Sequence, residues 1–298
     1  MTTCMSVTID APAKINLGLE ILGMRQDGFH EIRSVMAMIE LADTLHIFVD
    51  KAKAGTSVAD VPGSDTLIAR AIRAFHDAVP QSPQLGWTID RRIPIAAGLG
   101  GSSSDAAAAL IAANRIAGSP LERHELALLA ASLGSDIPFF LGNPAAIASG
   151  RGTILEPLNP MRYEVLLMVP TIDIPEKTTS LYSLIRPEDY SDGNQANETR
   201  ELLAGNRLPG IRNLRNAFSR PLASIEPRIL DLHRALSSSG CDAFGLSGAG
   251  PAHFVLEPER CVPGLRDALA QQFGNWLTLI PTRTRLAPLR VTQSVSNV

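Results

Sequence analysis

The stretch Pro94-Ile-Ala-Ala-Gly-Leu-Gly-Gly-Ser-Ser-Ser-Asp-Ala-Ala-Ala-Ala-Leu110 joins a turn rich in glycine and serine directly to a run of alanines. Glycines at positions 98, 100 and 101 allow the backbone to turn tightly and to approach a ligand closely. Alanine has the highest helix propensity, so we expect a helix here, with the serines 102–104 at its N-cap. The free amides and the positive end of such a helix predict an anion site, most often for phosphate. The alternative is an ordinary capped helix after a glycine turn.

The composition bounds the class of protein. The chain has 298 residues, of which 45% are hydrophobic and 19% charged, as is typical of a globular protein of about two domains. The net charge is −3 and no basic block occurs, which argues against nucleic acid or an anionic membrane as a partner. Three cysteines without CxxC spacing favour a reducing cytoplasm over a disulfide framework or a zinc site. No signal peptide and no run of eighteen apolar residues is found, so no membrane span is expected.

The apolar pattern predicts strands and helices in both halves of the chain. Expected strands cover residues 7–9, 15–22, 32–39, 44–49, 85–89, 165–169, 242–246, 252–256 and 276–281. Expected helices cover 67–75, 105–117, 122–133, 177–185, 196–204, 213–224, 226–238 and 260–273. The absence of strict βαβα alternation favours an α+β fold. A restart of the pattern near Pro160 predicts two domains, 1–160 and 161–298, and the polar tail after Leu286 is expected to be loose.

The glycine stretch does not fit the commonest phosphate loops. The chain contains no GxxxxGK[ST] string and no protein-kinase motifs, and Ser103 stands where a GxGxxG fingerprint needs its last glycine. Phosphate binding would therefore come from backbone amides and serine hydroxyls, without a lysine in the loop. A second glycine turn, Gly245-Leu-Ser-Gly-Ala-Gly-Pro251, is weak evidence by itself. Two such turns, one from each domain, could close on one triphosphate.

Candidate groups for proton transfer are Lys14, Asp136 and Asp105. Lys14 lies among small and apolar residues, although a lone lysine in a strand usually faces solvent. Asp136 follows a helix stop and precedes Ile-Pro-Phe-Phe, where an aspartate is usually a turn or cap residue. A carboxylate held among apolar groups near a lysine could instead act on a hydroxyl proton. The place of Asp105 in a first helical turn favours a dipole or capping role.

These segments together resemble the small-metabolite kinases named for galactose, homoserine, mevalonate and phosphomevalonate. The three motifs of that family are matched by residues 11–17 (APAKINL), 94–107 and 246–251. Within the family, Arg25-Gln-Asp-Gly-Phe-His-Glu31 and Gly134-Ser-Asp-Ile-Pro-Phe-Phe140 resemble the branch whose acceptor is a cytidylated polyol phosphate. The resemblance runs from about residue 8 to residue 282.

The resemblance implies ATP-dependent transfer of the γ-phosphoryl group to a hydroxyl of a small molecule, with Mg²⁺ as the second cofactor. It implies a β-rich N-terminal α/β kinase domain and a C-terminal α+β (ferredoxin-like) domain, with the active site in the cleft between them. Lys14 and Asp136 match the catalytic lysine and aspartate. The positions implied for ATP are Thr66, Pro94, Ala96, Ala97, Gly98, Leu99, Gly100, Gly101, Ser102, Ser103 and Ser104. The positions implied for the acceptor are Asn16, Phe29, His30, Thr178, Tyr182 and Gly248. No protein ligand to the metal is assigned, and a homodimer is left open.

The chain departs from the family pattern at several points. Ala96 and Ser102 stand where the family has glycine, which matters if either position needs a positive φ. About two extra residues near 174–178 make the alignment of Thr178 and Tyr182 insecure. Two alternatives remain open at this point. One is a kinase of the same family acting on homoserine or mevalonate, and the other is a non-catalytic relative that binds a small ligand.

Overall fold

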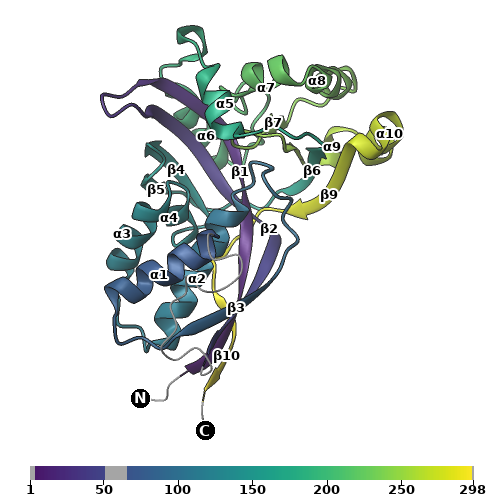
Figure 1. Ribbon diagram of the computed structural model, residues 1–298. Helices are drawn as coiled ribbons and strands as arrows, with labels where there is room; N and C mark the ends of the chain where they lie inside the picture. Colours follow the sequence, from purple (N-terminus) through teal and green to yellow (C-terminus); the bar gives the residue numbers. More distant parts are fainter. Residues whose placement is uncertain (1–3, 51–65, 297–298) are drawn as a thin grey trace.

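The computed structural model describes residues 4–50 and 66–296 (Figure 1). The described chain forms a six-stranded sheet and a four-stranded sheet, each with its own helices. The four-stranded sheet lies in the upper half of the view, whereas the two long purple strands of the six-stranded sheet extend from the lower half into the upper half (Figure 1). The expected α+β fold with two domains is therefore confirmed.

Two long antiparallel strands form the centre of the molecule. β1 (Cys4–Met24) pairs with β2 (His30–Val49), so that each merges two strands that the sequence predicts as separate. The apolar side chains of β1 enter three different hydrophobic clusters in turn along its length. Val7, Ile9 and Ala11 belong to the first, Ala13 to Leu17 to the second, and Leu19 and Ile21 to the third.

The first sheet has the order β10-β1-β2-β4-β5, with β3 also paired to β2. The remaining strands are β3 (Leu85–Asp90), β4 (Ala145–Gly150), β5 (Ile154–Pro157) and β10 (Val291–Ser296). The C-terminal part of β2, residues 44–49, pairs with β3, and its N-terminal part, residues 32–37, pairs with β4. A turn at residues 151–153 connects β4 to β5.

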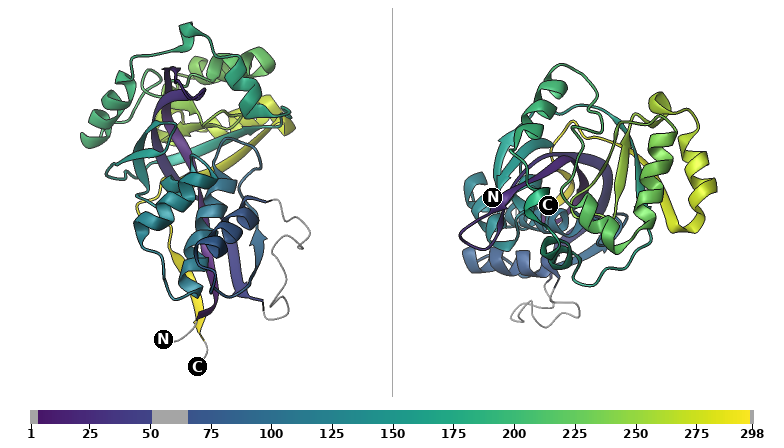
Figure 2. Two further views of the ribbon diagram at one scale, coloured as in Figure 1. Left: turned by 60° about the vertical axis from the view of Figure 1, so that its left-hand side comes forward. Right: turned by 90° about the horizontal axis from the view of Figure 1, so that it is seen from above.

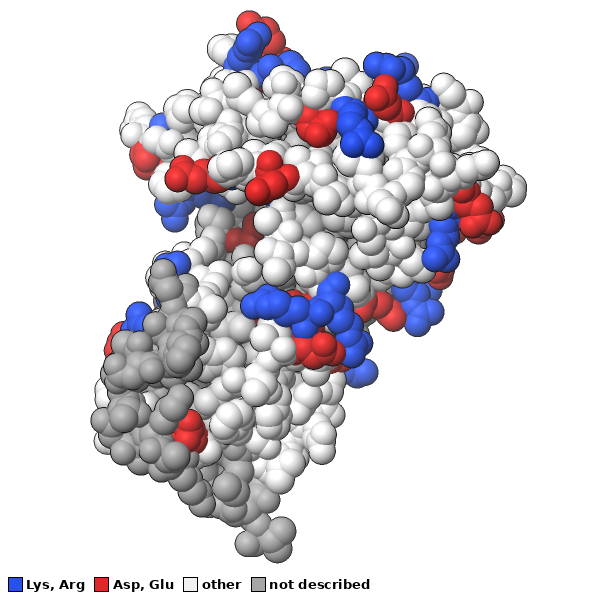
Figure 3. All heavy atoms as spheres, turned by 45° about the vertical axis from the view of Figure 1, so that its right-hand side comes forward, with Lys and Arg blue, Asp and Glu red and all other residues white. Residues whose placement is uncertain are grey.

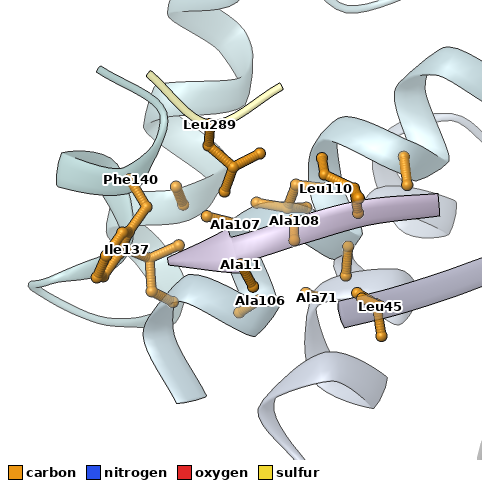
Figure 4. Packing of buried hydrophobic residues seen from close by; sticks show 14 of the residues in the cluster. Ala11, Leu45, Ala71, Ala106, Ala107, Ala108, Leu110, Ile137, Phe140 and Leu289 are labelled. Carbon is orange, nitrogen blue, oxygen red and sulfur yellow. The ribbon is translucent and has the colours of Figure 1, made fainter. Parts of the chain in front are cut away.

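Four helices pack beside the first sheet: α1 (Leu67–Ala78), α2 (Gly101–Ile116), α3 (Arg123–Leu133) and α4 (Ile137–Phe140). The alanines of α2 are fully buried, since their small side chains let the helix lie close against β1. Figure 4 shows Ala106, Ala107 and Ala108 of α2 packed around Ala11 of β1. The alanine run therefore supplies packing as well as helix propensity, and it fixes the glycine turn before α2 against β1.

The second sheet has the order β7-β8-β6-β9, formed by β6 (Glu164–Pro170), β7 (Phe244–Leu246), β8 (His253–Leu256) and β9 (Leu277–Arg283). Its helices are α5 (Lys177–Ser183), α6 (Asn194–Ala204), α7 (Ser219–Ile225), α8 (Arg228–Ser238), α9 (Pro258–Cys261) and α10 (Leu265–Phe273). Helices follow β6 and β8, and β7 and β8 form a hairpin. This β-α-β-β-α-β arrangement is the ferredoxin-like one that the resemblance implies.

The expectation of a loose tail is wrong. Residues 291–296 form β10, which pairs antiparallel with β1 at the edge of the first sheet. In Figure 2 the yellow end of the chain descends from the upper half, and its last strand lies beside the purple first strand near the two termini. The polar residues of β10 suit an edge strand, because one of its faces and one of its edges remain toward solvent.

Candidate active site

A cavity of roughly 1340 Å³ lies between the two halves of the molecule. Figure 3 shows the surface hollowed at this level. Such a volume exceeds that of a usual pocket for one small ligand, so it has room for two substrates. The cavity is lined by most of the residues that the resemblance implies: Lys14, Asn16, Phe29, His30, Pro94, Ala96, Ala97, Gly98, Leu99, Gly100, Gly101, Ser102, Ser103, Asp136, Thr178, Tyr182 and Gly248.

Thr66 and Ser104 are not among the residues that line the cavity. The hydroxyl of Thr66 accepts a hydrogen bond from the amide of Ala69 and so caps α1. Ser104 is fully buried, and its Oγ has no hydrogen-bond partner within the described part of the chain. Adenine binding by Thr66 and phosphate binding by Ser104 therefore stay predictions.

The helix after the glycine turn begins differently from the sequence expectation. The N-cap of α2 is Gly100, with φ of 72°, and it makes no side-chain capping bond. Ser102 to Ser104 lie inside the first turn of the helix, so the expectation that they cap it is wrong. The amide of Ser104 bonds to the carbonyl of Gly100, whereas the amides of residues 101–103 have no acceptor within the helix and lie at the cavity end of α2. An anion at this end is stabilised by the helix dipole.

Ala96 adopts the left-handed conformation, with φ of 54°. This is the conformation for which a glycine is the natural choice, and the family has glycine there. An alanine in this region carries a strain of about 1–2 kcal/mol. Ser102 lies in the helix, so its replacement of a glycine brings no such strain.

Lys14 and Asp136 are brought together as the sequence predicts. Lys14 Nζ lies 3.5 Å from Asp136 Oδ2, and the two side chains are 5% and 38% exposed. The amide of Lys14 donates to the carbonyl of Leu99 in the glycine turn, so β1 is bonded directly to that turn. Irregularities in the β1–β2 register occur on both sides of the segment from Lys14 to Asn16. Such bulges re-aim the side chains of a strand, and here Lys14 points into the cavity.

Asn16 orients Lys14. Its Oδ1 accepts from Lys14 Nζ at 2.6 Å and from the amide of Gly248 at 2.8 Å, and its Nδ2 donates to Ser34 Oγ at 2.7 Å. Asn16 is only 2% exposed. It therefore couples the lysine to the second glycine turn, and its predicted contact with the acceptor remains untested.

The two glycine turns touch each other. Ser247 Oγ donates to the carbonyl of Gly98 at 3.0 Å, and the amide of Ala252 donates to the carbonyl of Ala97. A Cβ at Gly98 would lie 2.3 Å from the carbonyl oxygen of Ser247, so only glycine allows this approach. The two turns are therefore in direct contact, and their closure on one triphosphate stays a prediction.

Aromatic side chains from the first hairpin and from α5 also line the cavity. His30 and Tyr182 stack with ring centroids 4.9 Å apart, which brings residue 182 to the first hairpin despite its insecure alignment. Burial lowers the pKa of His30, which favours the neutral ring. Burial and then the charge of Asp136 raise the pKa of Tyr182 to about 12, so its hydroxyl stays protonated. Phe29 is 51% exposed, with the guanidinium of Arg151 4.5 Å above its ring.

Asp105 is neither a cap nor a surface group. It is buried beside Asp43, and Arg91 Nη1 lies 3.1 Å from Asp105 Oδ2 and 3.8 Å from Asp43 Oδ2. Asp43 also accepts from the amides of Arg92 and Ile93, which lead into the glycine turn. Burial and then the charge of Asp43 raise the pKa of Asp105 to about 7. This cluster anchors the approach to the turn.

Sequence reasoning missed Lys177. Its ammonium donates to the carbonyls of Ala96 and Gly250, one in each glycine turn. The chain has only four lysines, at 14, 51, 53 and 177, although it has 27 Lys and Arg in total. The rarity of lysine in a chain rich in arginine could have drawn attention to residue 177. Its segment, however, departs in length from the family pattern, so no motif marked it.

Comparisons with known proteins agree with this geometry. Two family models match, GHMP kinases N terminal domain at residues 66–143 and GHMP kinases C terminal at residues 199–275. A protein of Gloeobacter violaceus named 4-diphosphocytidyl-2-C-methyl-D-erythritol kinase is 33% identical over 98% of this chain and 99% of its own length. One of the same name from Dehalococcoides mccartyi is 33% identical over 84% of this chain and 89% of its own length.

The fold comparison gives the same grouping. The crystal structure of a 4-(cytidine 5'-diphospho)-2C-methyl-D-erythritol kinase superimposes with a TM-score of 0.76 at 29% identity, covering 93% of this chain and 98% of that one. A homoserine kinase from Cytophaga hutchinsonii shares the fold at a TM-score of 0.67 and 14% identity, over 96% of this chain and 97% of that one. The chain thus belongs to the GHMP kinases and, within them, to the 4-diphosphocytidyl-2-C-methyl-D-erythritol kinase family.

Proposed function

We propose that this protein transfers the γ-phosphoryl group of ATP to the 2-hydroxyl of 4-diphosphocytidyl-2-C-methyl-D-erythritol in the non-mevalonate pathway of isoprenoid synthesis. The observation that carries this proposal is the pair of Lys14 and Asp136, 3.5 Å apart in a cavity that the glycine turn also lines. The names of the relatives support the choice of acceptor.

Asp136 accepts the proton of the attacking hydroxyl. Its carboxylate is the more exposed partner of the pair, so an acceptor can reach it. The acceptor oxygen then forms a bond to the γ-phosphorus, and the bond from that phosphorus to the β–γ bridging oxygen breaks to release ADP. Lys14 offsets negative charge on the transferred group.

The first turn of α2 binds the nucleotide phosphates through its amides and the exposed hydroxyl of Ser102. Mg²⁺ is the cofactor that accompanies such a transfer, and the cavity residues fit it. Mg²⁺ usually takes one or two carboxylates with phosphate oxygens and water. The carboxylates of Asp43, Asp136 and Glu176 line the cavity, and Asp136, beside Lys14, is the one we assign to the metal; bound Mg²⁺ would neutralise charge on the phosphates. The buried Ser104 does not fit as a ligand, because it does not line the cavity.

The cytidine end of the acceptor binds at the aromatic residues. Phe29 presents an exposed ring, and Tyr182 faces the same region through its contact with His30. A pyrimidine stacks favourably on such rings. His30 bonds the cytosine edge, and Asn16, Thr178 and Gly248 contact the polyol part. A homoserine or mevalonate kinase has no nucleotide-bearing acceptor and needs no such surface, which makes those functions the second choice.

The remaining expectations belong to the same proposal. No described helix is long and apolar enough to cross a membrane. The face in Figure 3 carries Lys, Arg, Asp and Glu interspersed, which supports a small-molecule partner over nucleic acid. A cytoplasmic location and a homodimer stay predictions. We propose a domain boundary near residue 160, with domains 1–160 and 161–298, since the two family models lie on either side of it; the last strand, β10, returns to the sheet of the first domain.

A coupled ATPase assay with three acceptors side by side tests the function. We expect turnover with 4-diphosphocytidyl-2-C-methyl-D-erythritol and little with homoserine or mevalonate. Turnover with homoserine or mevalonate alone would overturn the acceptor. The absence of turnover with any acceptor, together with intact ATP binding, would favour a non-catalytic relative.

A further inference from the structure

We propose that Lys177 is a phosphate-binding residue, whose ammonium joins the two glycine turns and supplies a second positive charge to the triphosphate held between them. This inference rests on the proposed function, because it assigns a role at the nucleotide end of the same cavity. It adds to the expectation that the glycine loop itself supplies no lysine: the loop has none, but the C-terminal half provides one.

The position of Lys177 follows from the start of α5. Glu176, the N-cap of that helix, has φ of 44°, and Lys177 is its first residue. The half-buried side chain of Lys177 reaches the carbonyl of Ala96 in the first glycine turn and that of Gly250 in the second. One side chain from the C-terminal half thus contacts both turns that surround the phosphate end of the cavity.

The contact with Ala96 explains how an alanine is held in a left-handed conformation. Strained residues persist where their surroundings over-determine them. The carbonyl of Ala96 accepts from Lys177, and the next residue, Ala97, bonds through its own carbonyl to the amide of Ala252. Hydrogen bonds from Lys177 and Ala252 in the C-terminal half therefore hold the first glycine turn in place, although Ala96 is strained.

The charge of Lys177 points to an anion. An ammonium has three donors, and two of them meet neutral carbonyls, so one donor remains. Within the described residues no ion pair joins Lys177 to a carboxylate. Lys177 and Lys14 line the same cavity, and burial and then the charge of Lys14 lower the pKa of Lys177 to about 8. The two ammonium groups in this cavity repel each other, and an anion bound between them would offset that repulsion.

Neither Asp136 nor Glu176 compensates the charge of Lys177, which leaves the ammonium available to a phosphate. Lys14 already has Asp136 at 3.5 Å, and Glu176 is exposed at the start of α5. Neither carboxylate forms an ion pair with Lys177 among the described residues. The amides of the α2 N-terminus and the ammonium of Lys177 converge on the same glycine turn, so a phosphate bound there receives both.

The test compares variants of residue 177 by titration calorimetry with Mg²⁺ and a non-hydrolysable ATP analogue, ADP or adenosine. Lys177→Met keeps the apolar stem and removes donors and charge, Lys177→Gln keeps donors without charge, and Lys177→Arg keeps both. Arg266→Met, on the exposed side of α10, is the matched control for loss of a cation. We expect the Met variant to bind the ATP analogue about 10- to 100-fold more weakly, and adenosine within about twofold of the wild type.

The Gln variant separates a phosphate contact from a mere clamp between turns. If charge matters, Lys177→Gln is as weak as Lys177→Met toward the ATP analogue, and Lys177→Arg recovers part of the affinity. Recovery by Gln, or equal losses for the ATP analogue and adenosine, would overturn the proposal. Binding needs no acceptor, so this result stands apart from the identity of the acceptor. Turnover with a different acceptor would refute the proposed function and leave the role of Lys177 in place.

Proton uptake gives a second readout. An anion beside Lys177 favours the charged ammonium, so binding of the ATP analogue at pH 8 should take up a fraction of a proton. Titrations in two buffers of different ionisation enthalpy measure that fraction. We expect it to fall in Lys177→Met and to be unchanged in Arg266→Met. Equal uptake by wild type and Lys177→Met would contradict the assignment, even if affinity fell.

Discussion

The ammonium of Lys14 lies 3.5 Å from the carboxylate of Asp136, and the lysine is the buried partner of this pair. The cation therefore remains in the protein interior while the anion stays within reach of a substrate. This asymmetry suits a base that must take a proton from an incoming hydroxyl, because the carboxylate is accessible while its cationic partner is shielded from solvent.

Asp136→Asn removes the proton acceptor with almost no change of shape. We expect turnover to fall by about 100- to 10,000-fold, since that is the usual contribution of a positioned base. Nucleotide affinity, measured by calorimetry, should change little. Asp267→Asn, on exposed α10, is the control and should behave as wild type. Weakened ATP binding with normal turnover would show that Asp136 has another role.

Phe29→Ala tests the cytidine end. Because Phe29 is 51% exposed, its loss should leave the melting temperature nearly unchanged. Loss of ring stacking should raise KM for the cytidylated acceptor about three- to tenfold, with KM for ATP unaffected. Leu128→Ala, which removes a similarly exposed apolar side chain from α3, is the control. Equal changes in both KM values would exclude a specific contact with the acceptor.

Gly98→Ala tests the contact between the two glycine turns. Its new Cβ would lie 2.3 Å from the carbonyl oxygen of Ser247, and both turns would have to separate. Gly264→Ala has a similar φ of 74° but no atom within 4 Å, so it isolates the cost of the conformation, about 1–2 kcal/mol. We expect Gly98→Ala to lower kcat/KM for ATP about 100-fold, and Gly264→Ala to leave it unchanged. Steady-state kinetics of both variants provide the comparison.

Asp105 predicts a dependence of stability on pH. Its pKa rises from 3.8 to about 7 on folding, chiefly because burial disfavours the charged form. Between pH 4 and pH 7 the folded protein therefore keeps a proton on Asp105 that the unfolded chain has lost. The stabilisation from this protonated carboxyl is fully present below about pH 4 and is lost as the pH rises to about 7. We expect Asp105→Asn to flatten the fall of the melting temperature between pH 4 and pH 7. Asp231→Asn, an exposed control, should keep the wild-type slope; a flattened slope in both would remove Asp105 as the cause.

Local patterns in the sequence predicted most elements because each depends on neighbouring residues. The helix after the glycine turn and the stop at Gly134 are found as expected. The predictions of strand boundaries failed where pairing with a strand distant in the sequence determines the structure. Pro12 lies within an unbroken β1 because β2 pairs alongside it, and residues 291–296 form a strand because β1 offers them an edge.

The pairing of Lys14 with Asp136 was predictable only through family resemblance, since their separation of 122 positions leaves no local trace. Lys177 shows the limit of that route. It contacts the carbonyls of Ala96 and Gly250 through a segment whose length departs from the family, so no motif marks it. Backbone carbonyls also carry no residue-type signal, which hides such a contact from any sequence pattern.

The continuity of β1 through three hydrophobic clusters bears on how the molecule denatures. Neither half can melt alone without withdrawing a strand that the other half needs. Heat should therefore disrupt both halves in one cooperative transition, with equal calorimetric and van't Hoff enthalpies, despite the presence of two domains.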